Sequence, residues 1–172
     1  MKSKKVFFLT QAALIAALYV VLTFLSNALG LASGTIQLRL SEVLTILPCF
    51  TLAAIPGLAL GCLLANFFTG CILFDVIFGC IATLLGAAGT YLLRKHPVLC
   101  TFPPVLSNML FVPFVLRYAY GFLFEYHGID LSVPFYMLTV GVGEVLCCCV
   151  LGGILSRTLK KQLRFLFDGA QH

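Results

Sequence analysis

Three of the six acidic residues in this chain lie at the start or in the middle of long apolar runs. Glu42 and Asp75 begin such runs, and Glu144 lies inside the run from residue 134 to residue 155. A carboxylate at bilayer depth costs about 2.5–3.5 kcal/mol on insertion scales, so it needs a bundle interior or a watery cavity. We therefore expect a fold that turns these acids inward and holds a small polar molecule inside the membrane.

The composition supports a membrane protein. Hydrophobic residues make up 61% of the 172 residues and charged residues only 10%, whereas ordinary soluble domains carry about 25% charged residues. The mean hydropathy is +1.09. The net charge of +5 does not indicate nucleic-acid binding, because the basic residues lie at the ends of apolar runs. We expect a single all-α membrane domain over residues 1–172.

The apolar runs predict a bundle of six transmembrane helices, over residues 6–29, 42–54, 57–70, 75–93, 99–121 and 134–156. The second and third runs are shorter than the ~20 residues that a bilayer requires. They could instead form one segment kinked at Pro48 and Pro56. With six crossings, nine of the eleven basic residues fall on one side, which the positive-inside rule assigns to the cytoplasm together with both termini. They are Lys2, Lys4, Lys5, Arg94, Lys95, Arg157, Lys160, Lys161 and Arg164.

The loop over residues 30–41 is a candidate lid on the outer face. Its last six residues, 36–41, alternate apolar and polar side chains with period two, which is typical of a half-buried extended strand. Such a strand would lie across the mouth of the bundle with Gln37 and Arg39 on one face. The alternative is a plain connecting loop.

The remaining candidate site residues follow from their depth in the predicted helices. Glu144 lies about 15 Å below the start of its helix at 1.5 Å per residue, and Asn108 lies at a similar level. Glu42 and Asp75 each lie near a helix N-terminus, whose dipole stabilises an anion. Arg117 lies near the outer end of the fifth predicted helix, and we expect it to join a polar funnel that is open to the outside and closed on the inner side by apolar residues. The candidate substrate-binding residues of this funnel are Gln37, Arg39, Glu42, Asn66, Asp75, Asn108 and Glu144.

Structural roles are the alternatives for the same residues. Arg39 and Glu42 would then form only an ion pair, and Asp75 only a helix cap. Glu144 would bind a neighbouring helix, and the asparagines would join helices through hydrogen bonds.

Two small-x-x-x-small pairs occupy the first helix: Ala12 with Ala16, and Ala13 with Ala17. Residues four apart lie on one helix face, where small side chains let another helix approach closely. These alanines are either an interface with a partner protein or an internal packing face.

No motif for catalysis or for a cofactor is present. The chain has no Gly-rich phosphate loop, no H-E-x-x-H and no G-x-S-x-G motif, so we expect neither an enzyme nor nucleotide hydrolysis. None of the eight cysteines forms a C-x-x-C pair, and the three histidines are scattered. We therefore predict no metal site and interpret the thiols, including the run Cys147-Cys148-Cys149, as small packing side chains.

Several stretches across most of the chain resemble the QueT family, the queuosine-precursor transporters. The most specific is the block from Ile36 to Pro48, with Gln37-Leu38-Arg39-Leu40-Ser41-Glu42 inside it. The others are Ala54-Ile55-Pro56-Gly57 with Gly61 and Asn66, Asp75-Val76-Ile77-Phe78-Gly79, Ala82-Thr83-Leu84-Leu85, Pro103-Pro104-Val105 with Asn108, and Thr139-Val140-Gly141-Val142-Gly143-Glu144.

The resemblance implies a substrate-binding S component of an energy-coupling factor importer in a prokaryotic plasma membrane. It implies six helices, a site near the outer face under the first loop, and a cargo such as an aminomethyl 7-deazaguanine or queuine. It also implies partners: a transmembrane coupling protein, which the four alanines of the first helix would face, and two ATPases. The S component would topple in the membrane to release its substrate inside.

Two other transport functions stay open. One, which keeps the kind of transporter that the resemblance implies, is an S component for another small, polar, vitamin-like molecule. The other is a small ion-coupled exporter that uses Glu144 as its proton-coupled carboxylate. A membrane enzyme would require a reactive constellation that the sequence lacks.

Overall fold

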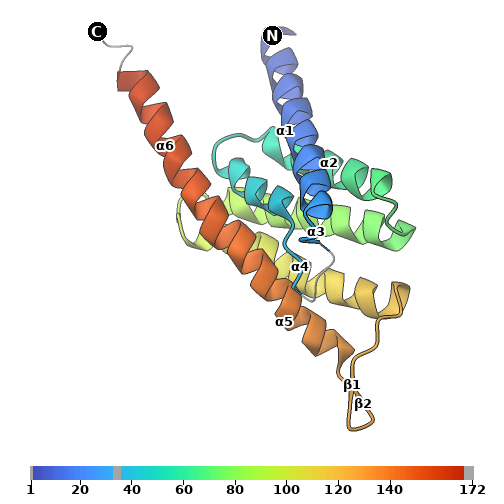
Figure 1. Ribbon diagram of the computed structural model, residues 1–172. Helices are drawn as coiled ribbons and strands as arrows, with labels where there is room; N and C mark the ends of the chain where they lie inside the picture. Colours follow the sequence, from blue (N-terminus) through green and yellow to red (C-terminus); the bar gives the residue numbers. More distant parts are fainter. Residues whose placement is uncertain (1, 33–35, 169–172) are drawn as a thin grey trace.

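The computed structural model describes residues 2–32 and 36–168, and most of them are helical (Figure 1). The first half of the chain forms α1 (Lys2–Ala28), the 3₁₀ helix η1 (Leu40–Cys49), α2 (Ala54–Phe68) and α3 (Leu73–Leu92). The next three segments follow one another without a break and form one continuous helical rod: η2 (Leu99–Thr101), α4 (Phe102–Phe114) and η3 (Val115–Ala119). After a short hairpin of β1 (Glu125–Tyr126) and β2 (Ile129–Asp130), the last rod joins α5 (Ser132–Glu144), η4 (Val145–Leu151) and α6 (Gly152–Asp168).

Four of these helical rods are long and apolar enough to cross a membrane: Lys4–Ala28, Leu73–Leu92, Leu99–Ala119 and Ser132–Gln162. The two short predicted spans are separate shorter helices, η1 and α2, and not one kinked segment. Pro48 lies in the last turn of η1, and Pro56 lies in the first turn of α2, where its missing N–H costs nothing. The fold is that of an all-α membrane protein, with four rods of spanning length in its described part.

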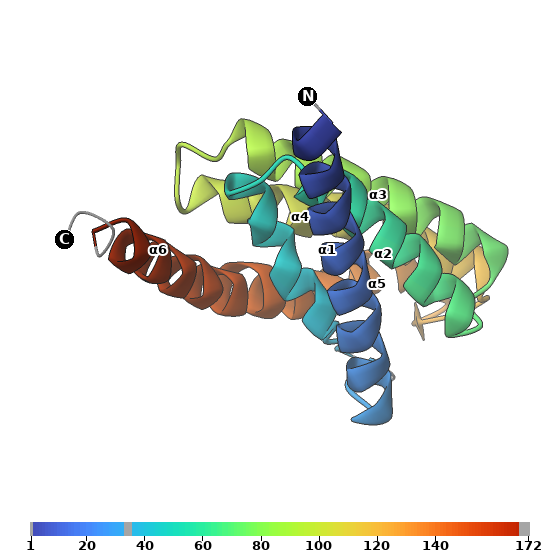
Figure 2. The same cartoon turned by 90° about the horizontal axis from the view of Figure 1, so that it is seen from above.

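The helices pack on their sequence neighbours around η1. α1 packs on α2, α2 on α3, α3 on α4 and α4 on α5, while η1 contacts α1, α3, η4 and α6. In Figure 1 the start of α1 and the end of α6 project from the end of the molecule opposite the hairpin. Figure 2 shows α1 crossing α2 at an angle. This arrangement puts η1, and therefore Glu42, in the middle of the bundle.

Small residues bring α1 and α2 into direct contact. A Cβ atom on Gly61 would lie 2.7 Å from the Cβ of Tyr19, and one on Gly57 would lie 2.8 Å from the backbone oxygen of Ala12. Ala16 is buried at this contact, and small facing residues are what membrane helices use for such close approach. Ala12 and Ala16 therefore pack inside the bundle.

The last two rods are interrupted by wider, π-helical turns. The sequence analysis predicts plain helices over 99–121 and 134–156, but η3 follows Pro113 and η4 begins directly after Glu144. Pro113 has no N–H to donate and crowds the carbonyl four residues earlier, which accounts for the irregular turn at η3. Single π turns inside α-helices are frequent at functional sites.

The predicted strand over 36–41 is wrong. Residues 36–39 have no regular secondary structure, and Leu40 already belongs to η1. The segment is fastened to the end of α1, because the backbone N–H of Leu38 donates to Leu31 O (2.9 Å) and that of Leu40 to Ser26 Oγ (2.8 Å). Of the expected lid over 30–41, residues 33–35 lie outside the described part of the chain.

We expect Gly61→Ala to lower the stability of the bundle by about 1–3 kcal/mol, the usual cost of overpacking, because the added methyl group would collide with Tyr19 and Ala16. The measurement is the thermal unfolding midpoint of the purified protein in detergent. Gly153→Ala is the matched control, since a Cβ there meets no atom within 4 Å. Equal midpoints for the two variants would contradict the close α1–α2 contact.

Candidate functional site

Two adjoining polar cavities lie between the helices around η1, and all seven predicted site residues line them. The larger cavity has a volume of about 500 Å³ and the smaller about 20 Å³. They share Gln37, Arg39 and Val112 as lining residues. Asn66 and Asp75 line the larger cavity, whereas Glu42, Asn108 and Glu144 line the smaller.

Asp75 organises the larger cavity. It lies in the first turn of α3, where the helix dipole favours an anion. Its Oδ2 lies 3.7 Å from Arg39 Nη2 and accepts a hydrogen bond from the Tyr120 hydroxyl at 3.2 Å. The backbone oxygen of Asp75 accepts a hydrogen bond from Asn66 Nδ2 at 3.3 Å. The cavity therefore presents a cation and an anion side by side, next to amide groups.

Glu42 lies at the smaller cavity and is buried. The hydroxyl of Tyr19, from α1, donates a hydrogen bond to Glu42 Oε1. The second oxygen, Oε2, has no hydrogen-bond partner among the described residues. Thr45 Oγ1 donates to the backbone oxygen of Glu42 at 2.6 Å. Tyr19 therefore makes the well-formed hydrogen bond to this carboxylate, and the amide of Asn108 and the guanidinium of Arg39 line the same cavity and also stabilise its charge.

Glu144 comes to the same cavity from the end of α5. Its Oε2 lies 3.2 Å from Cys148 Sγ, the donor thiol. Thr45 Oγ1 lies 3.4 Å from the same sulfur. Cys148 therefore joins η4 to η1 and also contacts a site acid, so its interpretation as a packing thiol alone is incomplete.

The segment that carries Gln37 and Arg39 rests against α5 at Gly143. A Cβ atom on this residue would lie only 2.2 Å from the backbone oxygen of Gln37. Glycine at this position lets the connecting segment lie directly against α5, one residue before Glu144. This close approach is consistent with Gln37 and Arg39 lining both cavities.

Among the cavity residues and their partners that sequence reasoning missed, Tyr19, Tyr120 and Cys148 each contact the side chain of a site acid. A signal existed for Cys148, because residues four apart share a helix face and Cys148 follows Glu144 by four. Tyr19 continues the Ala12–Ala16 face of α1 by three residues, and its hydroxyl, buried in an apolar helix, needs a partner. Tyr120 lies near the end of the predicted helix over residues 99–121, and no pattern in the sequence connects it to Asp75.

Arg117 is not part of these cavities. Its guanidinium binds Asp130 of the hairpin, with Nε and Nη2 both 2.7 Å from Oδ2. The hydroxyl and backbone N–H of Ser132 also donate to Asp130. These donors, with Ser132 the strongest, lower the pKa of Asp130 to about 2. Arg117 therefore fastens the hairpin to the end of η3.

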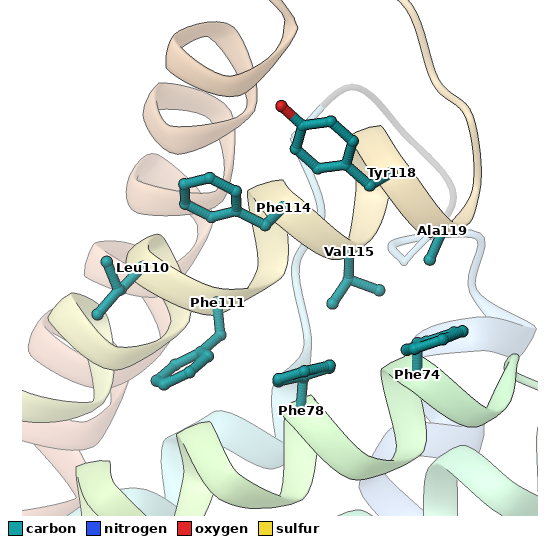
Figure 3. Close-up of a pocket in the computed structure, with 8 residues that line it drawn as sticks. All are labelled: Phe74, Phe78, Leu110, Phe111, Phe114, Val115, Tyr118 and Ala119. Carbon is teal, nitrogen blue, oxygen red and sulfur yellow. The ribbon is translucent and has the colours of Figure 1, made fainter.

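A third cavity, of about 480 Å³, is apolar (Figure 3). Phe74 and Phe78 of α3 face Phe111 and Val115 of the neighbouring rod across it. Its lining carries no charged residue, and its polar side-chain group is the hydroxyl of Tyr118. It is unsuited to a polar ligand, which would lose its hydrogen bonds to water there.

We expect Tyr19→Phe to destabilise the protein by about 1–3 kcal/mol, because it leaves the buried Glu42 carboxylate without its hydrogen-bond donor. Tyr118→Phe is the control, since the Tyr118 ring is exposed and its hydroxyl makes no hydrogen bond to the described residues. The thermal midpoint in detergent measures both. An unchanged midpoint for Tyr19→Phe would mean that this hydrogen bond contributes nothing to folding.

Comparisons with known proteins agree with the resemblance seen in the sequence. The model of a family described as "QueT transporter" matches residues 9–161. The protein named "Queuosine precursor transporter QueT" from Lactococcus lactis subsp. cremoris is 35% identical over 85 residues, which cover 49% of this chain and 50% of that protein. The matched stretch thus spans about half the length of this relative. No solved structure matches.

The family assignment excludes an enzyme and identifies a transport protein with membrane-spanning helices. The family match extends over most of the described helices, from α1 into α6. The chain belongs to the QueT transporter family.

Proposed function

We propose that this protein is the substrate-binding S component of an energy-coupling factor importer, and that it takes up a 7-deazaguanine precursor of queuosine. The observation that carries the proposal is the larger polar cavity with its Arg39–Asp75 pair, in a chain of the QueT family. The Lactococcus relative is named as a queuosine precursor transporter, which supports the cargo.

The size and lining of the larger cavity suit such a base. Small-molecule sites are usually clefts of about 300–1,000 Å³, and this one measures about 500 Å³. A guanine-like base offers ring N–H and amino donors on one edge, which a carboxylate accepts well. Asp75 is the acid at this cavity, and it would pair with the base edge or with an aminomethyl cation. Asn66 and Gln37 add amide donors and acceptors.

We further propose six crossings, with both termini in the cytoplasm of a prokaryotic cell. η1 and α2 would supply the two short crossings. At about 2.0 Å per residue η1 is ~20 Å long, and at 1.5 Å per residue α2 is about 22 Å long. Both are shorter than the ~30 Å hydrocarbon core, which thins locally around short helices at modest cost. The distribution of basic residues supports this topology.

Energy for uptake would come from partner subunits, because the sequence has no phosphate loop of its own. These partners are a transmembrane coupling protein and two ATPases, and substrate release would follow toppling of the S component. The surface for the coupling protein is the exposed pair Ala13 and Ala17 on α1. Ala12 and Ala16, which the sequence analysis includes in this interface, lie against α2 instead.

Isothermal titration of the detergent-purified protein with an aminomethyl deazaguanine tests the cargo. We expect micromolar or tighter binding to the intact protein, and its loss in Asp75→Asn, which removes the charge and keeps the shape. Glu125→Gln is the control, since Glu125 is an exposed acid of the hairpin. Failure of folded, intact protein to bind any deazaguanine base would overturn the proposed cargo.

Ala13→Leu tests the partner surface. Because the side chain is exposed, we expect the variant to fold and bind substrate normally but to lose uptake in cells that carry the coupling protein and the ATPases. Titration and uptake of the labelled base are measured side by side. Normal uptake by both Ala13→Leu and Ala17→Leu would place the coupling surface elsewhere.

A further inference from the structure

Three potential metal ligands from distant parts of the chain meet at the smaller cavity. Glu42 comes from η1, Glu144 ends α5, and Cys148 lies in η4. One donor atom from each lies within 4.8 Å of the other two. All three are buried, with exposed fractions of 2% for Glu42, 8% for Glu144 and 2% for Cys148. Modest side-chain movement would bring two oxygens and one sulfur around a single ion.

The second observation is that this cluster contains an unsatisfied acceptor. Glu42 Oε2 is buried and has no hydrogen-bond partner in the part of the chain that the structure describes. Buried polar atoms are nearly always paired, so an exception requires an explanation such as an ion or a water molecule. The adjoining cavity of about 20 Å³ holds about one water-sized particle, which is far too small for a base.

The charges also indicate a cation. Arg39 forms an ion pair with Asp75, and it also lines the small cavity, where its charge acts on Glu42 and Glu144. Among the described residues, neither of these two acids forms a direct ion pair of its own. Buried charges are normally paired or bound to a metal. Arg39 is one cation against the three carboxylates of Asp75, Glu42 and Glu144. The group therefore has a net charge of −2 when all are ionised, which one divalent ion neutralises.

The donor types narrow the choice of ion. Mg²⁺ and Ca²⁺ prefer oxygen ligands alone, whereas Zn²⁺ accepts cysteine sulfur together with carboxylate oxygen. A coordinated thiol loses its proton, and Cys148 Sγ lies within donor distance of Glu144 Oε2 (3.2 Å) and of the backbone oxygen of Glu42 (3.6 Å). Three protein ligands leave a fourth tetrahedral position free for a water molecule in the small cavity.

We propose that Glu42, Glu144 and Cys148 form a binding site for one divalent, thiol-binding metal ion of the Zn²⁺ type. The sequence analysis predicts no metal site because no closely spaced pair of ligands occurs in the chain. The fold creates the site by placing η1 against the junction of α5 and η4. This site lies beside the larger cavity and shares Gln37 and Arg39 with it as lining residues.

Metal titration of the chelator-treated, full-length protein in detergent tests the proposal. We expect one equivalent of Zn²⁺ to bind by calorimetry, and one equivalent of Cd²⁺ to produce the ultraviolet absorption band of a cadmium–thiolate bond. Cys148→Ser should abolish that band and weaken Zn²⁺ binding by about tenfold or more. Cys149→Ser is the matched control, because its thiol contacts Thr101 on the neighbouring rod instead.

Two results would overturn the proposal: no Zn²⁺ binding by the folded protein, or a cadmium–thiolate band that persists in Cys148→Ser. Glu144→Gln provides a second measurement and should weaken Zn²⁺ binding without removing the thiol. The titration contains no base, so the metal site can stand if deazaguanine binding fails, and deazaguanine binding can stand if the metal site fails.

Discussion

The burial of Glu42 is the constraint on which the rest of this structure depends. A carboxylate in the middle of an apolar bundle must be held by neighbouring groups. Here the hydroxyl of Tyr19 from α1 donates to the Glu42 carboxylate, and Thr45 of η1 donates to the backbone oxygen of the same residue. Tyr19 also packs against Gly61 of α2 at the close contact between α1 and α2, so the same residue serves helix packing and the hydrogen bond to Glu42. The packing of α1 on α2 and the position of the buried Glu42 charge are therefore linked through Tyr19.

The acids divide into two environments with different chemistry. Asp75 faces a base-sized cavity and is paired with Arg39, so its charge is balanced before any ligand arrives. Glu42 and Glu144 face a cavity of about one water molecule, which Arg39 also lines, and they form no direct ion pair with any described residue. A ligand in the larger cavity would compete with the Arg39–Asp75 ion pair. A cation beside Glu42 and Glu144 would instead balance their negative charge. This difference separates the proposed substrate site from the proposed metal site.

Irregular backbone gathers around the same place. η1 is a 3₁₀ helix, η4 has π-helical turns, and residues 36–39 have no regular structure. Within a membrane such backbone is tolerated only where protein or a water-filled cavity surrounds it. Here the irregular segments contact one another through Gly143, Thr45 and Cys148. Their irregular backbone helps to bring side chains from separate segments of the chain to the two polar cavities.

Much of the site was predictable because charge in an apolar chain is informative. Glu42, Asp75, Glu144 and the two asparagines stand out against apolar surroundings, and each lines one of the two polar cavities. Their part in binding stays a prediction, as does the six-span topology. Cys148 and Tyr19 were not predicted, because thiols and phenols are common in packed interiors and only a neighbour from another helix changes their role.

Sequence alone determined the all-helical membrane class, the family and the residues that must turn away from lipid, because the cost of burying charge depends on residue type and not on the fold. Tertiary structure decided which acid meets which partner: Asp75 meets Arg39, and Glu42 meets Tyr19. It also decided that Ala12 and Ala16 pack inside while Ala13 and Ala17 remain exposed. These outcomes depend on how helices cross and where their turns widen, which are properties of packed neighbours that no single segment specifies.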